Sequence, residues 1–368
     1  MIDQDHPKIR IFFLESSKNI GGQELQLLQQ MRELNELGYQ TKLLCKADSR
    51  VNDFAISQAL DVGVIPFRNA LHLPSIFAVI RQILELKPTV LICHSGHDAI
   101  IGSLAAKLVG LWSYKLQVIR MRTYQPSMPS SFPYNYLFDK TYTPSEHLRK
   151  KILSNQKIKS NCINVLYPGI DFSKLDDADS TLPDDLSDWL RDHPGSIVCH
   201  GAMLRAEKGH EIILRALPQV IKHAPNLRYV IAGEGPEKEY LTKLVQGLNL
   251  ENHVYFAGMV SPIAPLLKIS TLAILPSLIE PLGMFQIESQ YLEIPTIASN
   301  VDGIPETLIH EQTGLLVAPG DVNAWAQNMI WALANIDVIR SWAKVGKNYV
   351  VKKFSMANNT KDLVRIIN

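Results

Sequence analysis

The sequence predicts a two-domain α/β protein in which each domain is a doubly wound parallel sheet. Three observations support this: a length of 368 residues, two separate series of short apolar runs alternating with helical patterns, and an acidic stretch between the two series. A chain of this length is too long for one ordinary core. Strands that alternate with helices favour a parallel sheet covered by helices on both faces.

The first half of the chain contains the first alternating series. A helix is expected over 23–38, where leucines and a methionine recur on one face and Gly38 marks the end. A second helix is expected over Ala99–Leu108. The expected strands are Lys8–Leu14, Thr41–Cys45, Thr89–Cys93 and Leu116–Arg120.

The second series begins after residues 171–195, which are rich in aspartate and poor in strand signals. We interpret that stretch as the connection between domains, with one short helix. The helices expected beyond it are Glu211–His223, Glu237–Leu248 and Met284–Leu292. The expected strands are Ser196–His200, Arg228–Ala232, Val254–Phe256, Leu272–Leu275 and Thr296–Ala298.

These series predict domains over 1–170 and 171–353, with a C-terminal helix over about 354–368 that crosses back to the first domain. Ligands of doubly wound sheets bind at the carboxyl ends of the strands. We therefore expect the loops of the two domains to face each other across a ligand-binding cleft.

Composition favours a soluble cytoplasmic protein. Apolar residues make up 46% of the chain and charged residues 20%, and the longest apolar runs are a few residues each, against roughly 20 for a membrane span. The N-terminus has two acids before a short apolar stretch, which is not a signal-peptide pattern. The four isolated cysteines are expected to be free thiols, mostly buried: Cys45, Cys93, Cys162 and Cys199.

Charge is unevenly distributed along the chain. Residues 1–170 hold 20 Lys and Arg against 13 Asp and Glu, a net +7, whereas the remainder holds 17 against 23, a net −6. A basic half suggests an anionic partner such as lipid headgroups or a phosphorylated acceptor, although scattered solvated charge is an equal alternative. Nucleic acid is not expected, because no basic run is interleaved with aromatic residues.

The most informative segment follows the strand Leu272–Leu275. Pro281 suits the first turn of a helix, and the free amides of Gly283, Met284 and Phe285 would then form a site for a phosphate or diphosphate. Glu280 and Glu288 are eight residues apart, about 12 Å along a helix. That distance would let one carboxylate accept hydrogen bonds from a donor sugar and the other from a ribose.

The run from Pro276 to Asp321 resembles the signature block of the family-four retaining glycosyltransferases, including their Glu-x7-Glu motif. The resemblance extends upstream to the segments Glu207–His210 and Ala232–Pro236, and downstream to Phe354 and Ser355. It is looser in the first half, at the segment 21–24 and at His94 and Ser95. It implies the GT-B fold, which consists of two Rossmann-like domains facing across a cleft.

The resemblance also implies roles for individual residues. Glu280 would contact the donor sugar near the reacting carbon, Glu288 would hold the ribose, and Lys208 would pair with the diphosphate. Gly22 would bring backbone amides to the phosphates. His94 would reach the donor sugar or the developing charge from the opposite wall. The segment 256–259, with Gly258 and Met259, would frame the base.

One position departs from the family pattern. Members usually carry an arginine five positions before this lysine, and here that residue is Met203. Either Arg205 supplies the second cation, or the leaving group is held less strongly. Arg120 and Arg122 follow a strand and are candidates for the acceptor side.

No metal or other cofactor is expected. Asp177 and Asp179 form an Asp-x-Asp pattern, but no strand precedes it, so chance explains it better. His97 and His200 are more plausibly structural than catalytic. Departure of the nucleoside diphosphate would then depend on amides, on Lys208 and, if it replaces the usual arginine, on Arg205.

The expected reaction is transfer of a sugar, with retention, from a nucleotide-diphosphate sugar to a glycan or lipid-linked acceptor. By family analogy, a front-face route is favoured over double displacement, and the family's usual work suggests bacterial surface polysaccharide or lipopolysaccharide assembly. Two alternatives stay open: a catalytically silent sugar-nucleotide-binding scaffold, and an epimerase or phosphorylase of the same architecture. A helix expected over Ser145–Lys159, with five basic residues against one acid, suggests peripheral binding to an anionic inner membrane.

Overall fold

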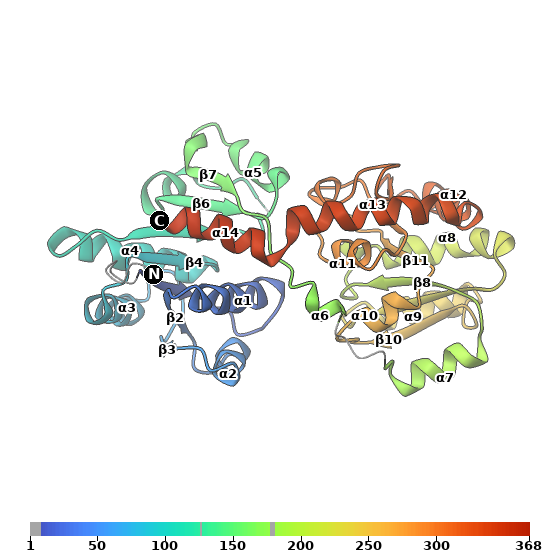
Figure 1. Ribbon diagram of the computed structural model, residues 1–368, viewed down its shortest axis with the longest axis horizontal. Helices are drawn as coiled ribbons and strands as arrows, with labels where there is room; N and C mark the ends of the chain where they lie inside the picture. The colour runs from blue at the N-terminus through green and yellow to red at the C-terminus, as the bar shows by residue number, and fades with distance from the viewer. Residues whose placement is uncertain (1–8, 126, 177–180) are drawn as a thin grey trace, which may run out of the picture. The chain divides into compact units, whose positions relative to one another are not determined.

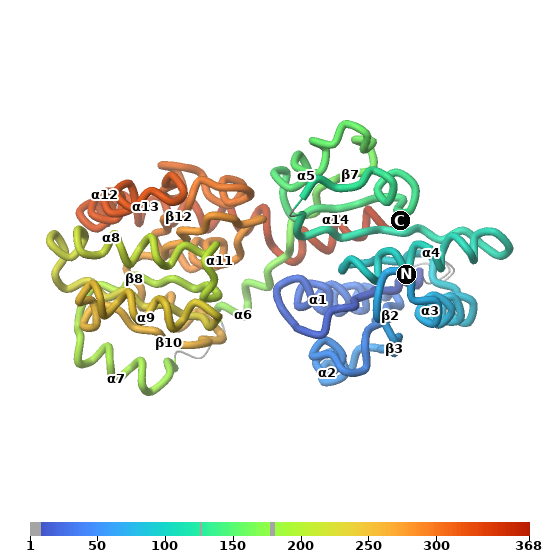
Figure 2. The backbone as a smooth tube through the Cα atoms, turned by 180° about the vertical axis from the view of Figure 1, so that it is seen from behind, coloured from blue at the N-terminus to red at the C-terminus, as the bar shows by residue number. Residues whose placement is uncertain are grey.

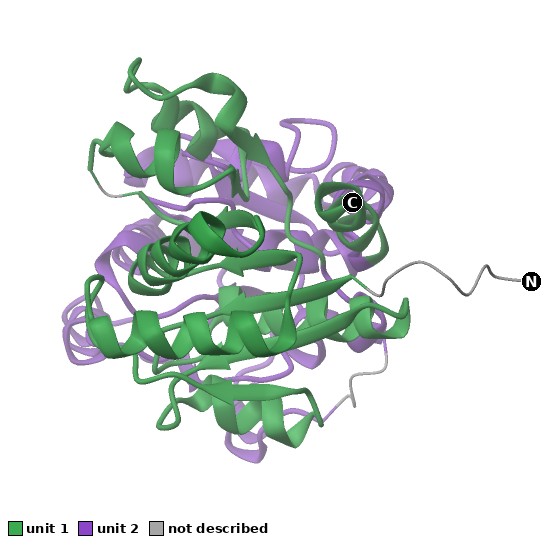
Figure 3. Ribbon diagram, turned by 90° about the vertical axis from the view of Figure 1, so that its left-hand side faces the viewer, with its two compact units in different colours: residues 1–169, 357–368 green, residues 170–356 purple. Residues whose placement is uncertain are grey.

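The structure is a computed structural model that describes residues 9–125, 127–176 and 181–368. The chain divides into two compact units, which we call unit 1 (Met1–Gly169 with Ala357–Asn368) and unit 2 (Ile170–Met356) (Figure 3). The sequence placed the change of domain at 170/171 and the return at about 354. The Asp-x-Asp pattern at 177–179 lies outside the described residues.

Unit 1 contains a seven-stranded sheet in the order β3-β2-β1-β4-β5-β6-β7 (Figure 1). Its strand pairs are parallel throughout. The strands are β1 (Arg10–Leu14), β2 (Gln40–Cys45), β3 (Val62–Val64), β4 (Val90–Cys93), β5 (Gln117–Met121), β6 (Lys140–Thr143) and β7 (Ile163–Val165). The helices are α1 (Gly22–Glu36), α2 (Arg50–Ser57), α3 (Leu73–Leu86), α4 (Gly96–Trp112) and α5 (Glu146–Leu153), with short turns η1 (Pro133–Leu137) and η2 (Ser160–Cys162).

Alternate residues of the central strands of unit 1 enter two different cores, because successive side chains of a strand point to opposite faces. Phe12, Leu14 and Leu91 pack with α3 and α4. Ile11 and Phe13 pack with α1, α2 and the C-terminal helix α14 (Met356–Ile367). The sheet is therefore covered on both faces, as the alternating pattern predicted.

Unit 2 contains a six-stranded parallel sheet in the order β10-β9-β8-β11-β12-β13. The strands are β8 (Ser196–Gly201), β9 (Leu227–Ala232), β10 (Val254–Gly258), β11 (Leu272–Leu275), β12 (Thr296–Ser299) and β13 (Leu315–Val317). The helices are α6 (Ser173–Asp176), α7 (Asp184–Asp192), α8 (His210–His223), α9 (Lys238–Gly247), α10 (Ala264–Lys268), α11 (Phe285–Tyr291), α12 (Val322–Ala334) and α13 (Ile336–Phe354), with short turns η3 (Ala206–Lys208) and η4 (Ile304–Glu306).

The same alternation fills the two cores of unit 2. Val198 and Ile274 face the core with α8, α9 and α12, whereas Cys199 and Leu275 face the core with α10 and α11. Leu186 of α7 is buried in this second core. The acidic stretch 171–195 is thus more than a connection, because part of it packs into unit 2.

The C-terminal helix returns to unit 1. Helix α13 ends at Phe354, and α14 lies among elements of the first half of the chain (Figures 1 and 2). Leu363 and Ile367 are buried in the core with α1. Asn359 accepts a hydrogen bond from Gln30 (2.9 Å) and donates one to the carbonyl of Tyr167 (2.6 Å).

The cysteines are free thiols, as expected. Three are buried in or beside strands, and Cys162 is partly exposed. Burial raises the pKa of the Cys45 thiol to about 11 and that of Cys199 to about 12. These thiols are structural at neutral pH.

Candidate active site

The carboxyl edge of the unit 2 sheet brings together the loops that follow β8 and β11. The amide of Leu278 donates to the carbonyl of Glu207 (2.8 Å). Gly209 has a φ of +73°, and a Cβ there would lie 2.0 Å from the carbonyl oxygen of Pro276. Only glycine fits this close approach of two backbones, so Gly209 sets the distance between the two loops.

Lys208 and Glu280 meet at this junction. The Lys208 Nζ lies 2.5 Å from Glu280 Oε2, and the two side chains retain 21% and 11% of their exposure. The Ser277 hydroxyl donates to the same carboxylate oxygen (3.3 Å). The structure therefore brings together two residues that are 72 positions apart in the sequence. Their expected ligands, the diphosphate for Lys208 and the sugar for Glu280, are the two parts of one donor molecule.

The backbone of Glu280 is also fixed by the loop after β12. Its amide donates to Asp302 Oδ2 (3.0 Å), and its carbonyl accepts from the amide of Gly303 (3.2 Å). A Cβ at Gly303 would lie 2.0 Å from the carbonyl oxygen of Pro281. Three consecutive strands of the sheet thus contribute to holding one carboxylate.

Two expectations about the following helix were wrong. Helix α11 begins at Phe285, so Pro281 lies in the preceding loop and not in the first helical turn. Gly283 has a φ of +87°, which interrupts any helical path from Pro281. Only Glu288 of the two glutamates is on the helix, so the helical rise does not give the distance between Glu280 and Glu288.

The first intrahelical bonds of α11 run from the amides of Ile287 and Glu288 to the carbonyl of Met284. The amides of Met284, Phe285 and Gln286 precede these bonds, as at any helix N-terminus. Of the three expected phosphate-binding amides, those of Met284 and Phe285 are at the start of α11, a helix of seven residues, whereas that of Gly283 lies in the preceding loop.

Glu288 has an unusual carboxyl group. Burial raises its pKa to about 7. Its side chain makes no hydrogen bond or ion pair with the part of the chain that the structure describes. The side chain is only partly buried, but a desolvated carboxylate without donors is unfavourable, and hydroxyl donors from a ligand would relieve this cost.

Arg205 precedes the turn that carries Lys208, and its carbonyl accepts from the Lys208 amide (2.9 Å). Its guanidinium is half exposed and lies 3.9 Å from Glu207. Met203 is 46% exposed. Gly258, with a φ of +65°, ends β10, and Met259 beside it is also exposed.

Sequence reasoning missed a histidine pair directly behind Lys208. His200, at the end of β8, stacks on His210, the first residue of α8, with ring centroids 4.1 Å apart. His200 Nδ1 also lies 2.8 Å from the hydroxyl of Tyr229. Burial and then the Lys208 charge lower the pKa of His210 to about 4, so this ring is neutral at pH 7. The pattern of the sequence contains no signal for this stacking.

In unit 1, His94 and Gly22 lie beside a polar network at the carboxyl edge of the sheet. Ser95 donates to Glu15, which accepts a second bond from Gln23 (2.9 Å), and Gln23 accepts from Thr123 (2.6 Å). The network thereby joins the ends of β4, β1 and β5 to the first turn of α1. Glu15 is fully buried, and no feature of the sequence singled it out.

His94 is almost fully buried and its ring lies against Phe13. Its Nδ1 is 3.4 Å from the carbonyl oxygen of Leu14, so Nδ1 carries the proton and Nε2 is an acceptor. Burial lowers the pKa of His94 to about 4. A neutral His94 can accept or relay a hydrogen bond, but it does not supply positive charge at pH 7. Gly22 is exposed and is the first residue of α1.

Arg120, near the end of β5, is buried beneath two aromatic rings. Its guanidinium carbon lies 4.9 Å from the ring centroid of Phe138 and 5.5 Å from that of Tyr134. Arg122 is partly buried and donates to Gln125 (3.1 Å). Both arginines belong to unit 1, as does His94, whereas Lys208, Glu280 and Glu288 belong to unit 2.

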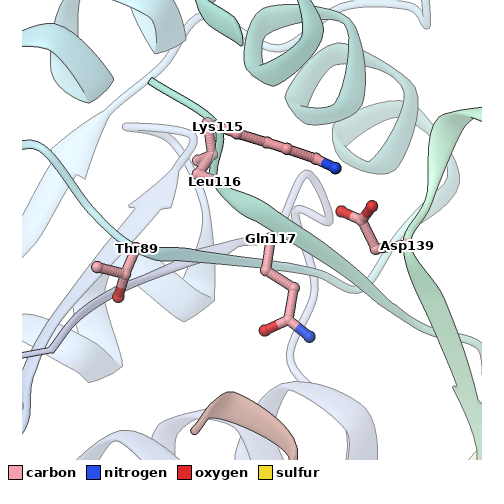
Figure 4. Close-up of a pocket in the computed structure, with 5 residues that line it drawn as sticks. All are labelled: Thr89, Lys115, Leu116, Gln117 and Asp139. Carbon is pink, nitrogen blue, oxygen red and sulfur yellow. The ribbon is translucent and has the colours of Figure 1, made fainter. Parts of the chain in front are cut away.

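A pocket of about 420 Å³ lies at the opposite edge of the unit 1 sheet (Figure 4). It is lined by Thr89, Lys115, Leu116, Gln117 and Asp139, which stand at or before the first residues of β4, β5 and β6. Ligands of parallel sheets bind at the carboxyl edge, so this pocket is separate from the candidate site residues.

Within the described ranges, no group of three or more His, Cys, Asp and Glu side chains is arranged to hold a metal ion. Nor does any described helix combine the length and apolar character needed to cross a membrane.

Two family models match the chain on either side of the division between units. Glycosyltransferase Family 4 matches residues 20–174, and glycosyl transferases group 1 matches residues 185–349. The chain belongs to the family-four glycosyltransferases, and its two parallel-sheet units form a GT-B fold.

Individual relatives are distant. An uncharacterised glycosyltransferase of Methanocaldococcus jannaschii is 27% identical over 61% of this chain and 58% of its own length. The N-acetyl-α-D-glucosaminyl L-malate synthase of Bacillus anthracis is 28% identical over 43% of this chain and 41% of its own. These matches thus span about two fifths to three fifths of each relative.

Solved structures match over nearly the whole chain. Anabaena HepE in complex with UDP superposes with a TM-score of 0.84 at 19% identity, covering 98% of this chain and 99% of its own. The same protein has been solved with UDP-glucose. At this identity the likeness establishes the fold.

Proposed function

We propose that this glycosyltransferase moves a sugar from a nucleotide-diphosphate donor, with retention and without a metal, to a glycan or lipid-linked acceptor. The observation that carries the proposal is the contact between Lys208 and Glu280 at the junction of the β8 and β11 loops. The contact places a cation beside a carboxylate. In a nucleotide sugar, a phosphate lies beside a sugar hydroxyl in the same way, so one donor molecule can meet both side chains.

Lys208 and Glu280 would act on opposite sides of the bond that breaks. In the proposed complex the Lys208 ammonium binds the diphosphate, while the Glu280 carboxylate accepts hydrogen bonds from sugar hydroxyls. As the bond between the anomeric carbon and the phosphate oxygen breaks, negative charge grows on the diphosphate. A fixed cation stabilises that charge more in the transition state than in the ground state, which accelerates the step.

Retention is best served by front-face transfer. The bond to phosphate breaks, the acceptor oxygen bonds to the same face of the anomeric carbon, and the acceptor proton passes to the departing phosphate. Double displacement would require a carboxylate nucleophile beneath the sugar. Glu280 is instead bonded to Lys208 and Ser277, which suits a binding role.

The donor class is supported by the HepE complexes, which contain UDP and UDP-glucose. We favour an acceptor in bacterial surface polysaccharide or lipopolysaccharide assembly, and a cytoplasmic enzyme held reversibly at the inner membrane. The membrane proposal rests on unit 1, where four exposed lysines adjoin exposed apolar side chains. The lysines are Lys150, Lys151, Lys157 and Lys159, and the apolar residues are Met128, Phe132 and Tyr136.

We call these seven residues the basic–aromatic surface. The side chain of Asn135 bonds to the backbone of Lys157 (2.7 Å) and Lys159 (3.0 Å), which ties the lysine segment to η1. The Lys159 ammonium lies 5.9 Å from the ring centroid of Tyr136. Lysines beside aromatic rings suit an anionic interface, because the cations meet headgroups while the rings enter the boundary layer.

A second candidate function is a catalytically silent sugar-nucleotide-binding scaffold, favoured by Met203 at the usual arginine position. The same assay separates the candidates. Purified protein is incubated with UDP-, GDP- and ADP-sugars, with and without glycan or lipid-linked acceptors, in excess EDTA. The proposal predicts release of one nucleoside diphosphate, faster with an acceptor and unaffected by EDTA. Binding without release supports the scaffold, and activity restored only by Mn²⁺ or Mg²⁺ contradicts the metal-independent mechanism.

A further inference from the structure

The structure contains a buried cation for which the proposed donor chemistry has no use. Arg120 is 7% exposed, and its side chain makes no hydrogen bond or ion pair with the residues that the structure describes. Its Nε is fully buried without an acceptor. Burying a guanidinium in this way costs free energy unless anionic or acceptor groups surround it.

The residues around Arg120 hold its guanidinium in place but do not provide hydrogen-bond acceptors for it. The rings of Tyr134 and Phe138 flank the guanidinium and compensate part of the cost. Asp98, in the first turn of α4, interacts with the Arg120 charge without forming an ion pair. Its Oδ2 already accepts from the amides of Ser16 (2.8 Å) and Ser95 (3.0 Å).

A second guanidinium lies close by. Arg122 is two residues further along the chain; burial lowers the pKa of the Arg120 guanidinium, and the Arg122 charge adds to that lowering. The Arg122 Nε is also fully buried and lacks an acceptor. Gln125 accepts from Arg122 (3.1 Å) and from the hydroxyl of Tyr134 (3.2 Å), so one amide orients both the second arginine and a ring that flanks the first.

We propose that Arg120 and Arg122 together bind an anionic group, a carboxylate or a phosphate, carried by the acceptor. Two like charges side by side oppose each other until an anion lies between them, and the planar fork of each guanidinium matches two oxygens of either group. The location also fits, because both residues are at the carboxyl edge of the unit 1 sheet, next to the network of Glu15, Gln23 and Ser95. The assignment to the acceptor depends on the proposed function, whereas the anion site itself does not.

The test measures anion binding to the full chain by calorimetry and thermal shift. The probes are inorganic phosphate and malonate, each against sodium chloride of equal ionic strength. All proteins carry Lys208→Ala, which weakens the proposed donor site in unit 2, so that the difference between variants of unit 1 reports binding at the arginine pair. Arg122→Gln is the main variant, because Arg122 is only partly buried and its loss endangers the fold less than that of Arg120. Arg81→Gln, an exposed arginine paired with Glu85 on α3, is the matched control.

We expect saturable binding of phosphate or of malonate, weakened about tenfold or more in Arg122→Gln and unchanged in Arg81→Gln. Preference for one probe identifies the anionic group as phosphate or carboxylate. Absence of saturable binding of either probe, or equal binding by Arg122→Gln and Arg81→Gln, overturns the proposal. Because Lys208→Ala is common to all samples, such a failure leaves the donor-site proposal unaffected.

Discussion

At the residue scale, Lys208 and Glu280 depend on their neighbours for their chemistry. The sequence motif identified both residues, and their contact follows from Gly209 and from the bond between Leu278 and Glu207. Other features at this scale had no sequence signal. The stacking of His200 on His210 and the burial of Arg120 beside Phe138 join side chains on different elements, which a periodic pattern within one element does not report. Hydrophobic periodicity indicates which face of a helix or strand is buried, but it does not indicate which polar side chains are buried with that face.

Glu288 leads to a prediction about pH. Its pKa of about 7 means that the carboxylate is largely protonated at pH 6 and ionised at pH 8. If ribose hydroxyls bind the ionised form, nucleoside diphosphate binding strengthens by about tenfold from pH 6 to pH 8, since binding at low pH must first remove a proton. Calorimetry at both pH values checks this. In Glu288→Gln the contribution of this carboxylate to the pH dependence disappears, and an equal pH dependence in that variant would contradict the assignment.

Glu288 also affects stability in the absence of ligand. Its folded pKa lies above the unfolded value of about 4.5, so the folded chain binds more protons between pH 4.5 and pH 7. Stability from this group therefore decreases as pH rises through that window, and the full cost is present above pH 7. Glu288→Gln is expected to be more stable than the wild type at pH 8, by about 1–3 kcal/mol, and nearly equal to it at pH 4.5.

A variant of Arg205 tests whether this residue replaces the arginine that family members usually carry at the position of Met203. Its guanidinium now lies 3.9 Å from Glu207, and it is half exposed, so it can move without breaking a strong contact. If Arg205 binds the diphosphate, Arg205→Ala weakens binding of the nucleoside diphosphate by about tenfold and leaves the nucleoside unchanged. Equal and small effects on both ligands would show that Lys208 acts alone.

At the scale of elements, the sequence predicted central strands better than loops and short helices. The expected strand Leu272–Leu275 coincides with β11, because a fully buried strand between turn signals has a clear pattern. The helix expected over Ser145–Lys159 is wrong in length, since α5 covers only Glu146–Leu153. The chain then turns, and Asn155 donates to the carbonyl of Pro129 (2.9 Å) in a contact that local propensity does not encode.

Gly209 carries the element-scale prediction. Gly209→Ala places a Cβ against the Pro276 carbonyl at a positive φ, so the β8 loop must move away from the β11 loop. We expect a loss of about 2–4 kcal/mol in unfolding free energy and weaker donor binding, because Lys208 moves with the loop. Gly247→Ala is the control, since nothing lies within 4 Å of its Cβ and it ends helix α9. Chemical denaturation and calorimetry that find the two variants alike would contradict this account of the junction.

At the scale of the whole molecule, two units divide the proposed tasks. Unit 2 carries the donor residues, and unit 1 carries His94, the arginine pair and the basic–aromatic surface. The return of a C-terminal helix to unit 1 was expected from the sequence. The contacts that anchor this helix, through Asn359, Leu363 and Ile367, were not expected, because their partners are more than 190 positions away in the sequence.

The basic–aromatic surface predicts binding to vesicles that contain phosphatidylglycerol and not to phosphatidylcholine vesicles. Each lysine near an anionic surface contributes about 1 kcal/mol, so the double variant Lys157→Gln, Lys159→Gln should bind about 30-fold more weakly. Binding should also fall steeply with salt. Lys243→Gln, an exposed lysine on α9 in unit 2, is the control. If co-sedimentation at low salt leaves the wild type in the supernatant with anionic vesicles, the acceptor is to be sought among soluble glycans.

The central claim is that Lys208 binds the diphosphate of a sugar nucleotide and stabilises its departure. The most direct measurement compares release of nucleoside diphosphate by the wild type and by Lys208→Ala, with the preferred donor at saturation and folding checked by circular dichroism. Removing the cation should cost about 2–4 kcal/mol of transition-state stabilisation, which is about 30- to 1,000-fold in rate. A folded Lys208→Ala enzyme that turns over within about threefold of the wild type would contradict the claim.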